Sequence, residues 1–166
     1  MRDEADVTTW LEIHNDAFGR TWGPAEYESA ILHHPMFLVT HTYFVIDGTG
    51  PIGTASIGVN RKNVEIGIGH YLQVRRRAQG LGVGKYLVLY RLHRLKDLGL
   101  RRCEIVTTLG YRKSLFIQFD CGAKPKLQLD YWNDLGQSSA LARRIVHYRL
   151  EGLYRTWMSE HPTKGS

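Results

Sequence analysis

Apolar and polar residues recur with two different periods along the chain, and the period assigns each segment to a helix or a strand. Apolar residues at three-four spacing predict helices, whose ends are marked by residues such as Asp6, Pro24 and Gly99. Runs of β-branched and aromatic residues between turn sequences predict strands. In chain order, the patterns predict helices at 6–19 and 24–33, strands at 37–46, 51–59 and 64–74, a helix at 84–98, a strand at 102–108, a helix at 111–121 and a strand at 126–132.

The third predicted strand alternates between an apolar face and a more polar one. The apolar face consists of Val64, Ile66, Ile68, His70, Leu72 and Val74. His70 is therefore expected among apolar side chains, whereas the Glu65 carboxylate faces the opposite side. Both a core role and a functional role fit a histidine in such a position.

The C-terminal segment has near-helical spacing of its apolar residues, which are Leu141, Ile145, Tyr148, Leu153 and Trp157. This spacing predicts a helix within 136–160, and a strand at 145–150 is the alternative. The chain shows no internal repeat, low-complexity tract or linker. Its length of 166 residues suits one domain spanning 1–166.

A glycine-rich segment lies between the third predicted strand and the helix that follows it. Gln79 is followed there by glycines at 80, 82 and 84, which allow tight turns and close approach of the backbone to a ligand. The next helix directs its unpaired amides and positive dipole end at that ligand, which favours phosphate. The dinucleotide-binding fingerprint needs a glycine where Lys85 stands, and the nucleotide-triphosphate loop needs Ser or Thr where Tyr86 stands. Neither of these phosphate loops therefore fits. A structural strand-to-helix turn is the alternative.

The pattern Gln-x-x-Gly-x-Gly from Gln79 to Gly84, with the apolar Val74 five residues earlier, resembles the pyrophosphate loop of the GNAT superfamily of acyl-CoA N-acyltransferases. The order of predicted elements is similar to the GNAT fold over nearly the whole chain. The resemblance implies an α/β fold, called α+β in some schemes, with three α-β-α layers. Its sheet would be mixed and mostly antiparallel, with six or seven strands, and the C-terminal helix would be an addition.

Composition narrows the classes of function. An apolar share of 43%, without a membrane-length apolar stretch or a secretion signal, predicts a cytoplasmic protein without membrane contact. The net charge of +6 suits an anionic cofactor, and the basic residues cluster too modestly to predict nucleic-acid binding. Cys103 and Cys121 show neither pairing nor metal spacing, and the chain has no zinc-binding histidine motif, so no metal is expected.

The resemblance also implies which residues bind acetyl-CoA, the expected co-substrate. Backbone groups of Leu72 and Val74 would hold the pantetheine arm, in a gap bounded by residues 107–108. The amides of 79–85 would hold the pyrophosphate. The cofactor-binding residues implied in this way are Leu72, Gln73, Val74, Gln79, Gly80, Leu81, Gly82, Val83, Gly84, Lys85 and Ser114. Charge near the phosphates would come from Arg75, Arg76 and Lys85.

Acyl transfer to an amine needs a base, because an alkylamine is mostly protonated at neutral pH. His70 has a suitable reference pKa, and its place four residues before Val74 is similar to that of a histidine in arylalkylamine N-acetyltransferases and mycothiol synthase-like proteins. The predicted catalytic residue is therefore His70. Gln118 replaces the tyrosine acid usual in the family, so Ser114, Tyr111 or water would protonate the thiolate, or it would leave unassisted.

These inferences predict an N-acetyltransferase that moves an acetyl group from acetyl-CoA to a primary amine of a small molecule, by direct transfer in a ternary complex. The alternative is a catalytically weak acyl-CoA-binding or regulatory module, which the missing tyrosine favours and His70 disfavours. The aromatic residues that the resemblance puts on the acceptor side are Trp22, Tyr27, Tyr43 and Trp132. Family members often dimerise, so a homodimer is one option.

Overall fold

The computed structural model describes residues 4–35, 37–105, 107, 111–125 and 140–162. The chain divides into two compact units, Met1–Val106 and Thr107–Ser166. Each unit has a hydrophobic cluster of its own. The expectation of one domain over 1–166 stays a prediction.

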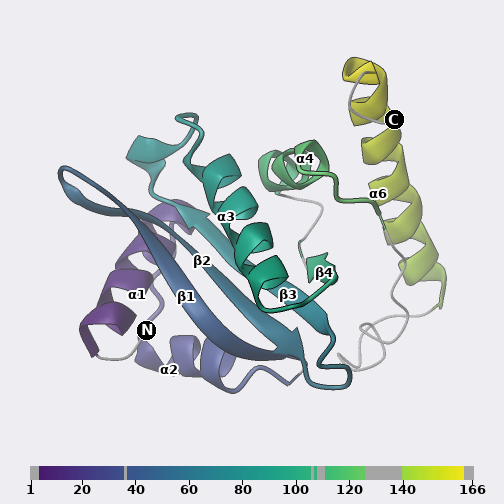
Figure 1. The fold of residues 1–166 in the computed structure, drawn as a ribbon. Helices are drawn as coiled ribbons and strands as arrows, with labels where there is room; N and C mark the ends of the chain where they lie inside the picture. The colour runs from purple at the N-terminus through teal and green to yellow at the C-terminus, as the bar shows by residue number, and fades with distance from the viewer. Residues whose placement is uncertain (1–3, 36, 106, 108–110, 126–139, 163–166) are drawn as a thin grey trace. The chain divides into compact units, whose positions relative to one another are not determined.

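The first unit is a sheet with helices on both faces (Figure 1). Its elements are α1 (Glu4–Phe18), α2 (Pro24–Tyr27), η1 (Glu28–Leu32), β1 (Phe37–Asp47), β2 (Gly50–Asn60), β3 (Ile66–Val74), η2 (Arg76–Ala78), α3 (Val83–Asp97) and β4 (Arg102–Ile105). The strands lie in the order β1-β2-β3-β4. Neighbours among β1, β2 and β3 are antiparallel, whereas β3 and β4 are parallel because α3 crosses over between them.

The order of elements and the mixed sheet agree with the sequence prediction. The described residues form four strands rather than six or seven, and the strand predicted at 126–132 lies outside them. β3 begins at Ile66 rather than at residue 64, because the turn after β2 extends further than expected. Within that turn, the Asn60 side chain accepts the Lys62 N–H, and the Asn63 side chain accepts the Glu65 N–H.

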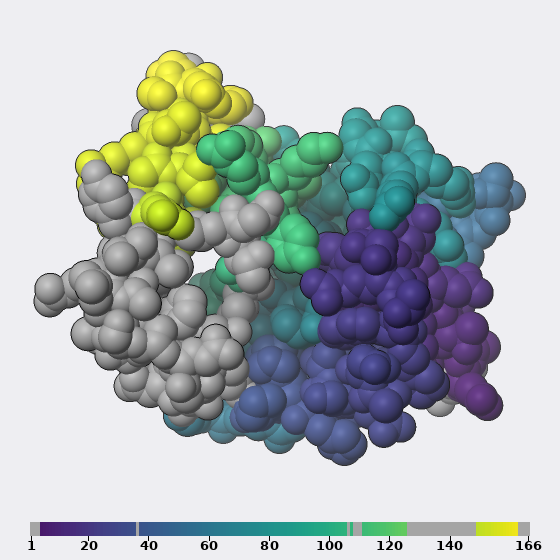
Figure 2. All heavy atoms as spheres, turned by 180° about the vertical axis from the view of Figure 1, so that it is seen from behind, coloured from purple at the N-terminus to yellow at the C-terminus, as the bar shows by residue number. Residues whose placement is uncertain are grey.

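Aromatic rings fill the face of the sheet under α1 and α2. Trp10 of α1 is fully buried, and its ring lies 5.1 Å from that of Tyr27 and 5.3 Å from that of Tyr71. Asn15 fixes the connection to α2, since its side chain both donates to and accepts from the backbone of Trp22. In Figure 2, seen from behind, the purple and blue atoms of the N-terminal helices cover this face.

The opposite face packs against α3, and glycines in the sheet make room for its side chains. A Cβ on Gly67 would lie 2.8 Å from Leu95, and one on Gly69 would lie 2.6 Å from the guanidinium carbon of Arg91. Arg91 is only 1% exposed. The two glycines therefore allow α3 to approach the sheet closely and to bury a charged side chain.

β3 carries a bulge at Tyr71 that the alternation pattern did not predict. Ser56 of β2 pairs with His70 and Ala55, the residue before it, pairs with Leu72, so Tyr71 is the extra residue of a β-bulge. Tyr71 has a φ of 41°, a left-handed conformation that is unfavourable for a tyrosine. The bulge shifts the alternation of β3 by one residue.

The prediction that Leu72 and Val74 share a face of the strand with His70 is therefore wrong. Val74 pairs with Gly53, and a Cβ on Gly53 would point at Leu87 and Val83 of α3. The ring of His70 lies 4.0 Å from that of Tyr71, which packs on α1. Thus His70 and Tyr71 face α1 and α2, whereas Leu72 and Val74 face α3.

The second unit contains α4 (Arg112–Asp120) and α6 (Ala140–Glu160). Leu115 and Phe119 of α4 pack against Trp157 of α6, whose indole N–H donates to the Asp120 carboxylate at 3.0 Å. The predicted C-terminal helix is confirmed, and the alternative strand at 145–150 is wrong. Among the helices that the structure describes, none is both long enough and apolar enough to cross a membrane.

Candidate active site

The glycine loop between β3 and α3 exposes backbone amides. Gly80 and Gly82 have φ values of 83° and 82°, a left-handed conformation that glycine adopts without strain. Gly82 is the N-cap of α3, no side chain caps the helix, and its first backbone hydrogen bond runs from the Tyr86 N–H to the Gly82 carbonyl. The amides of Val83 and Gly84 therefore have no acceptor inside the helix and face outward with its positive dipole end. This geometry suits an anion such as a phosphate group.

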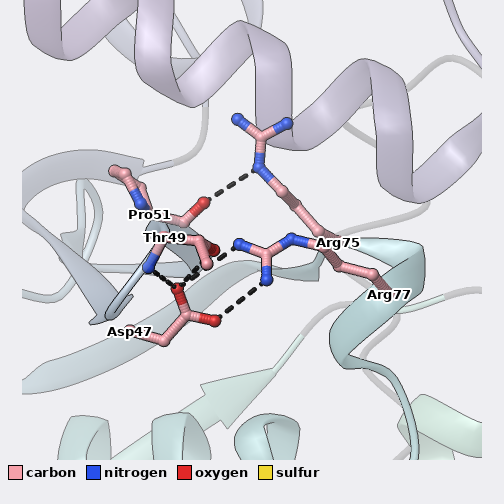
Figure 3. A network of polar contacts seen from close by, with 5 residues as sticks. All are labelled: Asp47, Thr49, Pro51, Arg75 and Arg77. Atoms are coloured by element: carbon pink, nitrogen blue, oxygen red, sulfur yellow. Dashed lines mark hydrogen bonds and ion pairs between the residues drawn. The ribbon is translucent and has the colours of Figure 1, made fainter.

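Arginine side chains fix the start of the loop (Figure 3). Arg75 donates from Nε to the Pro51 carbonyl at 2.9 Å and from Nη2 to the Glu12 carboxylate at 2.8 Å. Arg77 pairs with Asp47 at 2.9 Å, and this hydrogen bond is the main reason why the pKa of Asp47 lies well below its usual range. Figure 3 shows Arg75 and Arg77 reaching toward residues 47–51, which join β1 to β2.

Arg76, the residue between these arginines, contacts α1 instead. The Arg76 N–H donates to the Asp16 carboxylate at 2.7 Å, and a Cβ on Gly19 would lie 2.7 Å from the Arg76 guanidinium. The structure thus engages both Arg75 and Arg76 with α1 and its C-terminal end. Their predicted contribution to phosphate binding stays untested, whereas their role in holding the loop is visible.

We expect Arg75→Ala to lower the free energy of unfolding by about 1–2 kcal/mol, because it removes charge-assisted hydrogen bonds from a half-buried side chain. Arg77→Ala is the matched control, since the Arg77 side chain is 48% exposed against 22% for Arg75, and a smaller loss is expected. Urea unfolding of both variants measures the difference. Equal losses would show that the Arg75 contacts do not anchor the loop.

One edge of β3 pairs with β4 only as far as Gly69 among the described residues. Their pairing ends at Gly69 and Ile105, so among the described residues no strand pairs with this edge of β3 from His70 to Val74. The Val74 carbonyl accepts the Gln79 side-chain amide at 3.1 Å, which ties the loop to the end of the strand. An open strand edge binds an extended chain as a further strand would.

His70 lies at the bulge of β3, among aromatic rings. Its ring centroid is 4.0 Å from that of Tyr71, 4.2 Å from that of Phe37 and 5.3 Å from that of His34. Within the described structure, neither ring nitrogen has a hydrogen-bond partner. Burial, followed by the charges of His34 and Arg91, lowers the pKa of His70 to about 3. The imidazole is therefore neutral at physiological pH and able to accept a proton.

Residues 7–115 of the chain match the acetyltransferase (GNAT) family. The chain belongs to this family. The family membership, the α/β fold class and the assignment to the acetyltransferases predicted from the sequence are thereby confirmed. No functionally curated protein matches the sequence significantly.

This GNAT domain shares its fold with N-acetyltransferases of known structure. The ribosomal-protein-S18-alanine N-acetyltransferase from Escherichia coli superposes with a TM-score of 0.60 at 13% identity, over 75% of each chain. The aminoglycoside antibiotic 6'-N-acetyltransferase AAC(6')-IG from Acinetobacter haemolyticus gives 0.58 at 15% identity, over 76% of this chain and 90% of that one. AAC(6')-Iy, in complex with a bisubstrate analogue of CoA and acetylneamine, gives 0.59 at 13% identity, over 76% and 89%. At such identities the likeness shows the fold.

The remaining predicted site residues divide between the two units. Lys85 is exposed in the first turn of α3, and Gln73 is 1% exposed beside the bulge. Ser114 is half-buried in α4, where Gln118 is 3% exposed. Residue 108 lies outside the described residues, so the predicted gap beside 107–108 is not part of the described site. The roles of these residues stay predictions.

Sequence analysis missed Tyr71 and His34 as neighbours of His70. The bulge depends on a positive φ at a tyrosine, for which the alternating pattern gives no signal. His34 follows the helix predicted at 24–33, and nothing local indicates that its ring reaches His70 of β3. Gln73 was named for its place beside the pantetheine arm, yet its buried side-chain amide has no partner in the described residues.

Buried histidines are expected to make the first unit sensitive to acid. Burial is the main cause that lowers the pKa of His14 and His34 from 6.5 to about 4, and that of His70 to about 3. The unfolded chain therefore binds more protons than the folded one below pH 6.5, and the free energy of unfolding falls as the pH drops toward 4. Each such histidine adds a slope of at most about 1.4 kcal/mol per pH unit.

Thermal unfolding between about pH 7.5 and 4 measures this slope. His14→Phe is expected to flatten it, because the His14 ring packs 5.0 Å from Trp10 and its nitrogens have no partner in the described residues. A melting temperature that is constant over this range, or a His14→Phe profile identical to that of the wild type, would contradict the assignment of these histidines as neutral and buried.

Proposed function

We propose that this GNAT domain transfers an acetyl group from acetyl-CoA to the primary amine of a small molecule, by direct transfer in a ternary complex. The observation that carries the proposal is the uncapped N-terminus of α3 behind the left-handed glycines 80 and 82. It offers amide donors and a dipole to a pyrophosphate, at the end of a strand whose edge from His70 onward pairs with no strand among the described residues. Family membership makes acyl-CoA the expected source of that pyrophosphate.

The residues of the first unit fit the coenzyme in two places. The first-turn amides of α3 would bind the pyrophosphate, and backbone groups of β3 beyond Gly69 would bind the pantetheine arm in the manner of an added strand. Gln79 is already held by the Val74 carbonyl, so the loop needs little rearrangement on binding. When bound, acetyl-CoA supplies a thioester whose acetyl carbon an amine can attack.

His70 would act as the base. Its neutral imidazole lies at the β3 bulge with its nitrogens enclosed, so it would take the amine proton through water as the C–N bond forms. A pKa near 3 makes it a weak base, so its contribution to rate belongs at the lower end of the range for general bases. Relatives act on aminoglycosides and on the alanine of a ribosomal protein, so primary amines are accepted within this fold.

A panel of small primary amines with detection of released thiol tests the proposal. We expect thiol release that depends on both acetyl-CoA and an amine, with the acetylated amine found by mass spectrometry. Binding of acetyl-CoA without turnover of any amine would favour the catalytically weak binding module instead. Absence of acetyl-CoA binding would contradict the proposal at its first step.

A further inference from the structure

A second histidine ring lies against His70 on the side of the sheet that α1 and α2 cover. The ring centroid of His34, which follows η1, is 5.3 Å from that of His70, with an angle of 62° between the planes. Phe37 contacts both imidazoles: it stacks on His34 at 3.6 Å and meets His70 edge-on at 4.2 Å. Two imidazoles from distant segments are thus held together by one buried phenylalanine.

The π-helix η1 positions His34. The His33 N–H donates to the Glu28 carbonyl at 2.8 Å, which is the wide turn of a π-helix and a feature often found at functional sites. The same turn brings the backbone of Ala30 near enough to His70 to oppose part of the lowering of its pKa. Arg61 fixes the backbone of His34, since its Nε donates to the His34 carbonyl at 3.0 Å.

His34 stands between His70 and the surface. The nitrogens of His70 are enclosed, whereas His34 is half-buried and flanked by the exposed His33 and Pro35. Two half-buried titratable rings contact His70, those of Tyr71 and His34, and an imidazole accepts a proton far more readily than a phenol, so His34 is the group suited to receive a proton from His70.

Resting on the proposed acetyl transfer, we propose that His34 takes the amine proton from His70 and releases it to solvent. The amine lone pair forms the new C–N bond, and the C–S bond breaks with its electron pair going to sulfur. The amine proton passes to one nitrogen of His70 while the other nitrogen gives its proton to His34, since neutral imidazole both donates and accepts. Rotation about χ2, a broad torsion in histidine, is the motion that would bring a nitrogen of each ring together.

The greater burial of His70 favours transfer of the proton toward His34. Burial and the charge of Arg61 lower the pKa of His34 to about 4, whereas burial, His34 and Arg91 lower that of His70 to about 3. His34 is the less enclosed of the two rings, so a proton on it is the better solvated. Both values lie far below neutral pH, so the pair returns to its neutral form after each turnover.

Substitution of His34 tests the proposal. We expect His34→Ala to lower kcat by about 10- to 100-fold, less than the loss of a base itself, with the KM for acetyl-CoA unchanged. Added imidazole should restore the rate with saturation, and the solvent deuterium isotope effect on kcat should rise. His34→Phe keeps the stacking on Phe37 without a titratable nitrogen and should be equally slow, with a wild-type melting temperature.

His33→Ala is the matched control, because His33 is adjacent to His34 and its side chain is exposed. This variant should retain full activity. Full activity of His34→Phe, or a slow His34→Ala enzyme that imidazole does not restore, would overturn the relay. The proposed function fails separately, if the wild-type protein acetylates no amine. If the wild-type enzyme is active and His70→Phe is slow, but His34→Phe is unimpaired, the proposed function stands. Only the proton transfer from His70 to His34 is then contradicted.

Discussion

Replacing His70 with phenylalanine is expected to slow acetyl transfer about 100-fold while leaving acetyl-CoA affinity and stability near the wild-type values. The variant loses the proton acceptor but keeps an aromatic ring against Phe37 and Tyr71. Beyond a weak contact with the Ala30 backbone, neither imidazole nitrogen has a hydrogen-bond partner in the described residues, so removal of both costs little there. The effect stays at the lower end of the range for general bases, since a pKa of about 3 gives little driving force for proton transfer.

His14→Phe is the matched control for this variant. It makes the same exchange on the same side of the sheet, at a buried histidine whose nitrogens also have no partner in the described residues, and should keep full kcat.

The pH profile offers a further check. The sequence places the ionisation of His70 near 6.5, whereas the structure moves it to about 3, so the wild-type rate should show no histidine step between about pH 6 and 8. If His70→Phe keeps the wild-type kcat, His70 is not the base.

Gly82→Asp is expected to weaken acetyl-CoA binding by about 100-fold or more. The substitution puts a carboxylate at the N-cap of α3, where the pyrophosphate would lie. Two like charges about 4 Å apart repel by roughly 4 kcal/mol at the effective dielectric constant near a protein surface, which exceeds the loss expected here. Aspartate also caps the helix and uses amides that would otherwise bind phosphate.

Gly99→Asp provides the control at the opposite end of the same helix. Gly99 has a φ of 78° and Gly82 one of 82°, and a Cβ at either position meets open space, so both substitutions bring similar backbone strain. An acidic residue at the C-terminal end opposes the helix dipole, so Gly99→Asp should be the less stable variant and yet bind acetyl-CoA normally. Calorimetric titration of both variants decides between them, and equal affinities would exclude the glycine loop as the binding site.

Local signals account for what the sequence predicted well. The glycine loop lies where its spacing placed it, because left-handed turns at Gly80 and Gly82 and an uncapped helix start are properties of a short segment. The C-terminal helix follows from the spacing of its own apolar residues, although a strand had stayed possible there. Both the order of elements and the crossover from β3 to β4 follow from the same kind of pattern.

Contacts between distant segments account for what the sequence could not predict. The bulge at Tyr71 reverses the faces of the residues after it, and it depends on packing against Trp10 rather than on alternation. The burial of Arg91 of α3 depends on Gly69 across the interface, which leaves space for its guanidinium group. The contact of His34 with His70 depends on the π-turn of η1, which a helical pattern does not distinguish from an ordinary turn.

A single-turnover experiment with acetyl-CoA labelled in its acetyl group tests the central claim most directly. Enzyme in excess over labelled acetyl-CoA is mixed with an amine from the active panel, and the label is followed by mass spectrometry in coenzyme, protein and amine. The account predicts that the label moves from the coenzyme to the amine without appearing on the protein, and that this step slows about 100-fold in His70→Phe. Label that stays on bound coenzyme with every amine, or that accumulates first on the protein, would contradict it.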